Sequence, residues 1–263
     1  MDCRHAGPYS KLAYIAQFDS AVLQKSVYSG HTAVLNHFNA VLSEVINREF
    51  ESLASKADRR FFLSMLDTLS ATSHLGAFWT QELINLKAGA ENAWLGYGLR
   101  AVKSPLRDIR MADNLNWLYH NKYAGKKIIV WAHNIHISRN TTFGKRKIYF
   151  YNQTTGNEIY SKLRDTVYSI GFTSYSGSAG RLPSKPYKIS PPGGECFESW
   201  VHAKGIQYGF MDLRTCNYNT PFRMQGLQHW DVKANWNNIF DGVFYIQDMY
   251  PCDRVKQPHA KTD

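Results

Sequence analysis

The feature that most constrains how this chain can fold is a short apolar run followed at once by two histidines. Residues 128–132 (IIVWA) are too few for a helix and are rich in β-branched side chains. Such a run is typical of a strand buried on both faces in the middle of a parallel sheet. Ligands of open α/β sheets bind just beyond the carboxyl ends of the strands. His133 and His136, which follow the run, are therefore candidate site residues.

The positions of these two histidines also have a purely structural explanation. His133 can be a core histidine that ends a strand, and His136 can be an ordinary loop residue, because histidine is common in both settings. The spacing alone does not choose between a site and a structural role.

Helical spacing dominates the N-terminal half. Apolar residues recur three and four positions apart over residues 33–53 and again over residues 58–89, which predicts two long amphipathic helices. Asp58 stands where the second helix begins, so we expect it to be the N-cap. His74 lies inside that second helix among apolar residues and is expected to pack rather than to bind.

A shorter apolar run precedes these helices. Residues 12–16 can form a first strand, and Asp19 follows its end. A carboxylate at that place can hydrogen-bond a neighbouring loop or face a ligand, and both roles remain open.

A third helical region covers residues 91–123 and is interrupted near Pro105. Proline suits the first turn of a helix, so a new helix is expected from there. Arg107 and Asn114 fall on one face of it, from which both could reach the end of the strand that follows. A solvent-facing polar flank is the alternative.

The C-terminal half alternates strands and helices. Strands are expected over residues 165–173, 208–213 and 242–246, and helices over 157–164 and 197–203. Strand-helix-strand order is typical of a parallel sheet with crossover helices. We therefore predict an α/β fold: a mostly parallel central sheet flanked by helices, with a helical layer or subdomain of long helices in the N-terminal half. The expected arrangement is one domain over residues 1–263, with a helical part (33–123) and a strand-helix-strand part (124–250).

Charge and cysteine usage exclude several classes of function. The formal net charge is +10, but the lysines and arginines are scattered, so neither a nucleic-acid partner nor a membrane surface is expected. The four cysteines form no CxxC pair, which leaves a structural zinc site or a disulfide framework without support. No apolar run has membrane-spanning length and the N-terminal residues lack the charged-then-apolar layout of a signal peptide, so we expect a cytoplasmic protein.

Several motifs in collinear order resemble those of the erythromycin esterase family. WAHNIH at residues 131–136 is similar to that family's Trp-Ala-His-Asn-x-His signature, and RDIRMADNLNWL at 107–118 to its Arg-Asp-x-x-Met-Ala-Glu-Asn helix. Further resemblances are spread over most of the chain: QFD at 17–19, SIGFTSYSGS at 169–178, PPGGECFESWVHAKGIQYGFMDLR at 191–214 and FDGVFYIQD at 240–248.

The resemblance implies a metal-independent hydrolase without a cofactor, which opens esters of the macrolide lactone type by attack of a water molecule. Ester hydrolysis needs a base with a pKa near neutrality and donors that stabilise an oxyanion. His133, His136 and Arg107 are the expected catalytic residues. Asn134, Asn114 and Asp19 are the expected substrate-binding residues. The expected partner is a small-molecule ester.

One family motif is missing from this sequence. Members of the family open with a strand followed by Gly-Glu-x-x-His-Gly, whose histidine is assigned the role of base, but here the Gly-Glu pair at 194–195 has no such histidine. We therefore expect an N-terminally incomplete chain with impaired activity and uncovered strands that allow self-association. The alternatives are a noncatalytic remnant with a small-molecule cleft, and a metal-dependent hydrolase that uses His133 and His136 with a distant carboxylate.

Overall fold

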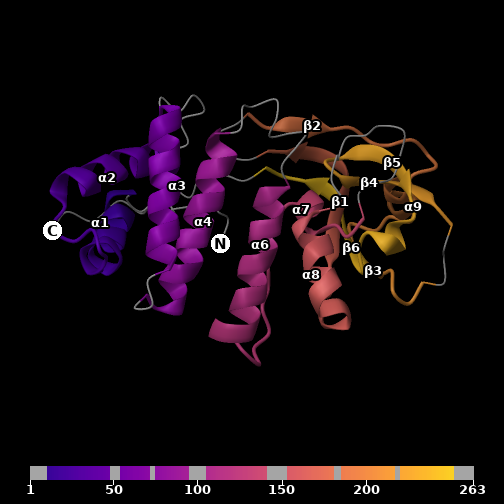
Figure 1. The fold of residues 1–263 in the computed structure, drawn as a ribbon. Helices are drawn as coiled ribbons and strands as arrows, with labels where there is room; N and C mark the ends of the chain where they lie inside the picture. Colours follow the sequence, from indigo (N-terminus) through magenta and orange to yellow (C-terminus); the bar gives the residue numbers. More distant parts are fainter. Residues whose placement is uncertain are drawn as a thin grey trace, which may run out of the picture. The chain divides into compact units, whose positions relative to one another are not determined.

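A computed structural model describes residues 11–47, 54–71, 75–94, 105–140, 153–180, 185–216 and 220–251. The chain divides into two compact units, residues 1–129 and residues 130–263, which are coloured from indigo to magenta and from rose to yellow in Figure 1. No described helix has the length and apolar character that crossing a lipid bilayer requires.

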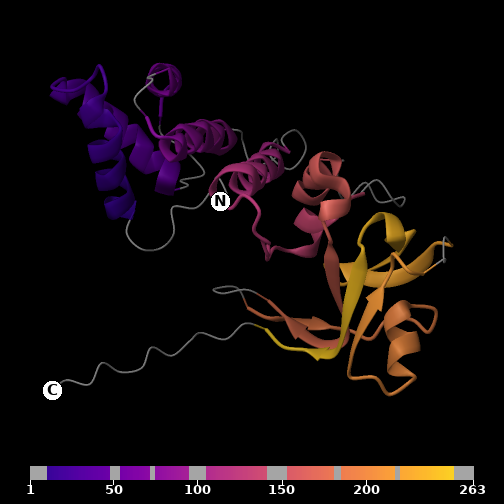
Figure 2. The same ribbon diagram turned by 90° about the horizontal axis from the view of Figure 1, so that it is seen from below.

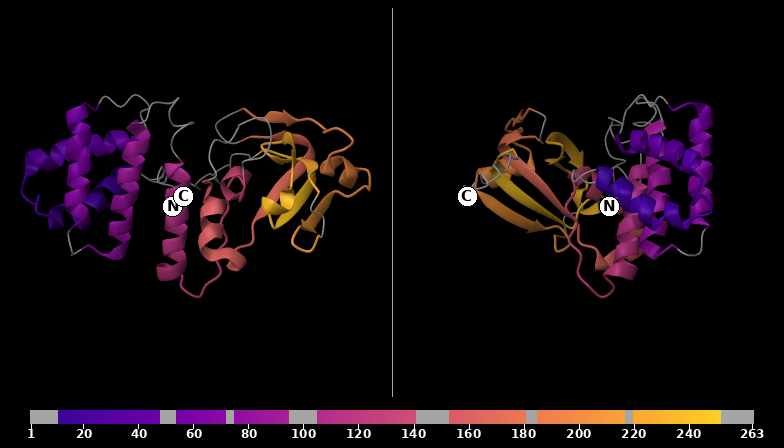
Figure 3. Two further views of the ribbon diagram at one scale, coloured as in Figure 1. Left: turned by 45° about the vertical axis from the view of Figure 1, so that its right-hand side comes forward. Right: turned by 90° about the vertical axis from the view of Figure 1, so that its left-hand side faces the viewer.

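The first unit is built from helices. The helices are α1 (Lys11–Ala21), η1 (Leu23–Lys25), α2 (Thr32–Asn47), α3 (Lys56–Ser70), α4 (Ala77–Trp94), α6 (Leu106–Trp117) and the π-helical turn η2 (Leu118–Lys122). Their core contains a stack of aromatic rings, in which the ring centroids of Phe18 and Phe38 are 6.0 Å apart and those of Phe38 and Phe62 are 4.7 Å apart. Figure 3 shows α1 to α4 packed side by side, which confirms the helical subdomain predicted for the N-terminal half.

Three local predictions for this unit are corrected. Residues 12–16 lie inside α1, not in a strand, because Tyr14 and Phe18, one helical turn apart, pack together in the core of this unit. Ser55, not Asp58, is the N-cap of α3; Asp58 is the third helical residue and completes a capping box with it. The single helix expected over 58–89 is two helices, α3 and α4. His74 lies outside the described residues.

The second unit contains a four-stranded sheet with the strand order β2-β1-β6-β3, seen from below in Figure 2. The strands are β1 (Ile170–Ala179), β2 (Tyr187–Ile189), β3 (Tyr208–Asp212) and β6 (Gly242–Met249). β1 and β6 are parallel, whereas β1 pairs with β2, and β3 with β6, in antiparallel direction.

The prediction of a mostly parallel sheet is therefore wrong. Parallel neighbours need a crossover connection, usually a helix. The chain between β3 and β6 instead forms a separate hairpin, β4 (Phe222–Leu227) with β5 (Trp230–Ala234), and the short turn η4 (Trp236–Asn238). No sequence pattern predicted this hairpin.

The buried strand predicted over residues 128–132 is also wrong. These residues form no strand, and Ile129 and Trp131 are 93% and 83% exposed. A β-branched run becomes a strand only where another strand pairs with it, and no strand among the described residues does so here. Instead, the backbone of Phe172 on β1 is bound by the side chain of Asn134.

The sheet has one covered face. Val243 and Tyr245 of β6 pack there with Phe222 and Trp236 in the core of this unit, under α9 (Phe197–His202). The helices predicted over 157–164 and 197–203 are confirmed as α8 (Thr155–Leu163) and α9. The strand expected from residue 165 begins only at Ile170, because η3 (Arg164–Thr166) precedes it.

Candidate active site

Of the two predicted histidines, His133 immediately precedes a single helical turn, α7 (Asn134–Ile137), and His136 lies within it. His133 is the N-cap residue of that turn, and its Nδ1 atom accepts a hydrogen bond of 3.3 Å from the backbone N–H of Ile135. His133 is exposed and His136 is half-buried. The cap orients the ring of His133, since it uses one of the two ring nitrogens.

Asn134 fastens this turn to two strands. Its Nδ2 atom donates to the carbonyl oxygens of Phe172 on β1, at 2.6 Å, and of Gly226 on β4, at 2.7 Å. Its Oδ1 atom accepts from the backbone N–H of Phe172 at 3.1 Å. The amide therefore satisfies backbone groups as a neighbouring strand would. This geometry gives Asn134 a positioning role, and its contact with substrate stays a prediction.

A cluster of ion pairs around Asp241 fixes Arg139, which follows α7. Asp241 is 2% exposed, and its Oδ1 atom lies 2.6 Å from Arg139 Nη1 and 2.7 Å from Arg214 Nε. The backbone N–H of Ser169 donates to Oδ2 at 2.8 Å. Burial alone would raise the pKa of Asp241, but these three donors hold it below its usual range. Sequence reasoning missed this cluster, although Asp241 belongs to the FDG segment.

The turn between β4 and β5 carries a further histidine, His229. His229 is the second residue of the turn between β4 and β5, and its Nδ1 atom is 3.1 Å from the hydroxyl oxygen of Tyr187 on β2. Burial lowers the pKa of His229, and the positive charge of His133 lowers it further. No motif marked His229, because the turn that carries it is distant from His133 in the sequence.

Helix α9 carries a buried carboxyl group. Glu198 of α9 is fully buried, and its Oε1 atom accepts hydrogen bonds from the Thr173 hydroxyl and, at 2.7 Å, from the backbone N–H of Gln225. Its Oε2 atom has no hydrogen-bond partner among the described residues. Burial raises the pKa of Glu198 to about 7, although the hydrogen bonds act in the opposite direction.

The other predicted site residues belong to the helical unit. Asn114 is 3% exposed, and its Oδ1 atom accepts a hydrogen bond of 2.6 Å from Gln81 Nε2. Asp19 lies on the surface of α1 and accepts a hydrogen bond of 3.0 Å from Gln24 Nε2. Arg107 is half-buried in the first turn of α6. The structure thus brings together His133, Asn134 and His136, and the approach of the other three to them stays a prediction.

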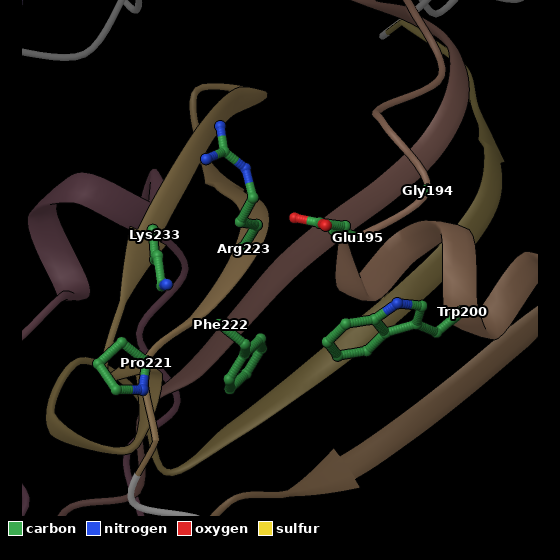
Figure 4. A pocket seen from close by; sticks show the side chains of 7 residues that line it. All are labelled: Gly194, Glu195, Trp200, Pro221, Phe222, Arg223 and Lys233. Carbon is green, nitrogen blue, oxygen red and sulfur yellow. The ribbon is translucent and has the colours of Figure 1, made fainter.

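The hairpin, α9 and the segment before α9 also line an open pocket of about 320 Å³. Figure 4 shows the residues that line it: Gly194, Glu195, Trp200, Pro221, Phe222, Arg223 and Lys233. None of the predicted site residues lines this pocket. Across the described ranges, no three His, Cys, Asp or Glu side chains are grouped so that they could hold a metal ion.

Comparison with known proteins gives a consistent result. The model of the erythromycin esterase family matches residues 9–249. The putative hydrolase YbfO of Bacillus subtilis is 28% identical over 163 residues, which are 57% of this chain and 36% of that protein. Erythromycin esterase type II of Escherichia coli is 26% identical over 157 residues, which are 54% of this chain and 36% of that protein. Each match thus spans about a third of the relative's length.

A solved structure shares the fold. It is an erythromycin esterase mutant in its open conformation, with a TM-score of 0.60 at 16% identity, and the superposition covers 90% of this chain and 64% of the other.

Proposed function

The chain belongs to the erythromycin esterase family, and from that premise we propose that it acts on a carboxylic ester of the macrolactone type. In this proposal a water molecule attacks the ester carbonyl with help from histidine, without a metal ion or cofactor. The ester is a small molecule, and the reaction leaves a carboxylic acid and an alcohol.

The position of His133 is the observation that carries the proposal. An imidazole can act as a base near neutral pH, and it works best where its direction is fixed. His133 caps α7, and the Asn134 side chain ties that turn to β1 and β4. His136 follows one helical turn later and is the second imidazole of the proposed site.

The helical unit supplies the remaining proposed roles. Arg107 carries a permanent positive charge that can stabilise the tetrahedral oxyanion. Asn114 and Asp19 are proposed to bind polar groups of the substrate. These roles rest on the family resemblance of the helix that contains Arg107 and of the QFD segment.

The sequence also supports a low rate for this chain on its own. The 263 residues contain no Gly-Glu-x-x-His-Gly motif, and a positioned general base contributes typically about 10²- to 10⁴-fold to a rate. A protein that binds the ester without turning it over is the second candidate function, and the same missing motif favours it.

Ligand titration of two alanine variants tests the proposal. We expect His133→Ala to abolish binding of a macrolide or a generic ester, measured by calorimetry, and to abolish any residual hydrolysis. His136→Ala is expected to weaken binding less, because its ring is not oriented by a helix cap. His31→Ala, an exposed histidine of the helical unit, is the control.

The opposite order contradicts the proposal. If His136→Ala removes binding while His133→Ala retains it, with circular dichroism unchanged in both, then His133 does not control the site.

A further inference from the structure

One side of the open pocket beside α9 is aromatic. Trp200 and Phe222 line it, and their ring centroids are 6.2 Å apart with the ring planes tilted by 38°. Phe222 is buried, so the core fixes its ring, whereas Trp200 is exposed. Figure 4 shows the two rings side by side. Together they offer a ligand a flat apolar surface.

Contacts within the protein fix the walls of this pocket. Cys196 and Arg223 form a parallel backbone bridge, and Cys196 Sγ donates a hydrogen bond of 3.3 Å to Asp231 Oδ1. Arg223 binds the same carboxylate with two nitrogens, Nε at 2.9 Å from Oδ1 and Nη2 at 2.6 Å from Oδ2. These contacts join the segment that carries Glu195 to the hairpin. The pocket is therefore preorganised, which reduces the free-energy cost of binding.

The charge balance of the pocket favours a neutral ligand. Hydrogen bonds from Arg223 hold the pKa of Asp231 below its ordinary value, so the carboxylate stays ionised and neutralises that guanidinium. Lys233 and Glu195 also line the pocket, and neither has a hydrogen-bond or ion-pair partner among the described residues. Their opposite charges cancel, so an anion or a cation gains no net attraction. A free donor beside a free acceptor suits hydroxyl groups, because a hydroxyl both donates and accepts.

We propose that this pocket binds a neutral sugar, one pyranose ring of which stacks on Trp200. A pyranose presents C–H groups on its face, and these pack on the electron-rich face of the indole. The sugar hydroxyls donate to the Glu195 carboxylate and accept from Lys233 Nζ. A volume of about 320 Å³ is at the low end for small-molecule pockets and suits a single ring. Because no residue of the proposed ester site lines the pocket, this sugar site goes beyond the proposed function and does not depend on it.

Titration with cellobiose, followed by NMR of the indole N–H signals, tests the site without requiring activity. The β-glucosyl rings of cellobiose carry their hydroxyls around the edge, so both faces are rich in C–H groups. We expect the Trp200 signal, assigned by its loss in Trp200→Ala, to shift as cellobiose is added. Trp200→Ala should weaken binding about tenfold or more. Glu195→Ala and Lys233→Met each remove one polar partner and should each weaken binding about tenfold.

Trp230→Ala is the matched control, because it removes an indole of the same hairpin that does not line the pocket. It should keep the affinity of the unaltered chain. Sorbitol, a polyol without a ring face, should not bind, and added sodium chloride should not weaken the binding of cellobiose, because the ligand is uncharged.

Several results would overturn the inference. They are an unshifted Trp200 signal, unchanged affinity in Trp200→Ala, unchanged affinity in both polar variants, an equal loss in Trp230→Ala, or equal binding of sorbitol. Tighter binding of benzoate than of cellobiose, lost as salt is added, would identify an anion site instead. Circular dichroism of each variant shows whether a loss of binding comes from unfolding, and the two polar variants test the site even if Trp200→Ala does not fold.

Discussion

Glu198 has the most unusual environment of the carboxyl groups that the structure describes in the sheet unit. It is fully buried, two donors reach its Oε1 atom, and burial is the main cause that raises its pKa to about 7. A carboxyl group with a raised pKa binds a proton more tightly in the folded chain than in the unfolded chain. Its protonation therefore couples folding to pH.

This coupling predicts how stability depends on pH. Between the ordinary pKa near 4.5 and the folded value of about 7, the folded state holds more protons than the unfolded state. The free energy of unfolding should fall as pH rises through this window, by up to about 1.4 kcal/mol per pH unit. Urea denaturation at a series of pH values measures the slope.

Substitution isolates the contribution of this group. Glu198→Gln should remove the slope, so the variant gains stability relative to the parent chain as pH rises from about 5 to 8. Glu195→Gln, an exposed carboxyl on the same segment, is the control and should keep the slope. An unchanged slope in Glu198→Gln assigns the pH dependence to another group.

At the scale of elements, the junction between β1 and β4 positions the candidate site. These strands belong to different sheets, yet two side chains bridge them at adjacent positions. Asn134 binds Phe172 and Gly226, while Glu198 binds Thr173 and Gln225. The turn that carries His133 therefore takes its position from this junction.

Removing the amide tests the junction. Asn134→Ala leaves up to three backbone groups of β1 and β4 without their partner, and each buried group left unsatisfied costs about 1–3 kcal/mol. We expect a loss of stability in that range or above it, measured by urea denaturation. Asn134→Asp keeps the acceptor for Phe172 N–H but cannot donate, so it should also destabilise. Asn36→Ala, at an exposed position of α2, should cost little; equal losses in both alanine variants contradict the bridging role.

At the scale of the whole molecule, one face of the four-stranded sheet carries a row of aromatic rings. Trp131 and Phe172 have ring centroids 5.3 Å apart, and Phe172 and Phe244 5.5 Å apart. Phe210 pairs with Phe244 across the sheet. Trp131 and Phe210 are 83% and 52% exposed, and contiguous apolar surface of this kind promotes association.

We therefore predict that the chain self-associates, although its net charge of +10 opposes association. Sedimentation should show species heavier than the 30.2 kDa monomer. Combined Trp131→Ser and Phe210→Ser changes should shift the chain towards the monomer, whereas Trp200→Ser, outside the aromatic row, should not. A sharp monomer peak with a cooperative melt in the unaltered chain rules the prediction out.

The sequence by itself determined the features that depend on neighbours along the chain. Helical periodicity located α2 and marked α3 and α4 as helical, though as one helix, and the apolar run at residues 242–246 located β6. The WAHNIH motif and its companions identified the family, because each motif is contiguous. The sequence placed a cap near the start of α3 but did not identify the N-cap residue. Ser55 and Asp58 are both suitable caps, and only the backbone angles show that Ser55 is the N-cap.

The tertiary structure alone decided which distant segments meet. Strand direction depends on the connection, so the hairpin between β3 and β6 makes β3 antiparallel. Strand formation depends on a partner, so the β-branched run at residues 128–132 remains exposed coil. The contacts of His229 with Tyr187, and of Asp241 with Arg139, join residues 42 and 102 positions apart. Periodicity and spacing describe a chain locally, whereas pairing and side-chain contacts are set by free energies gained only when remote segments pack together.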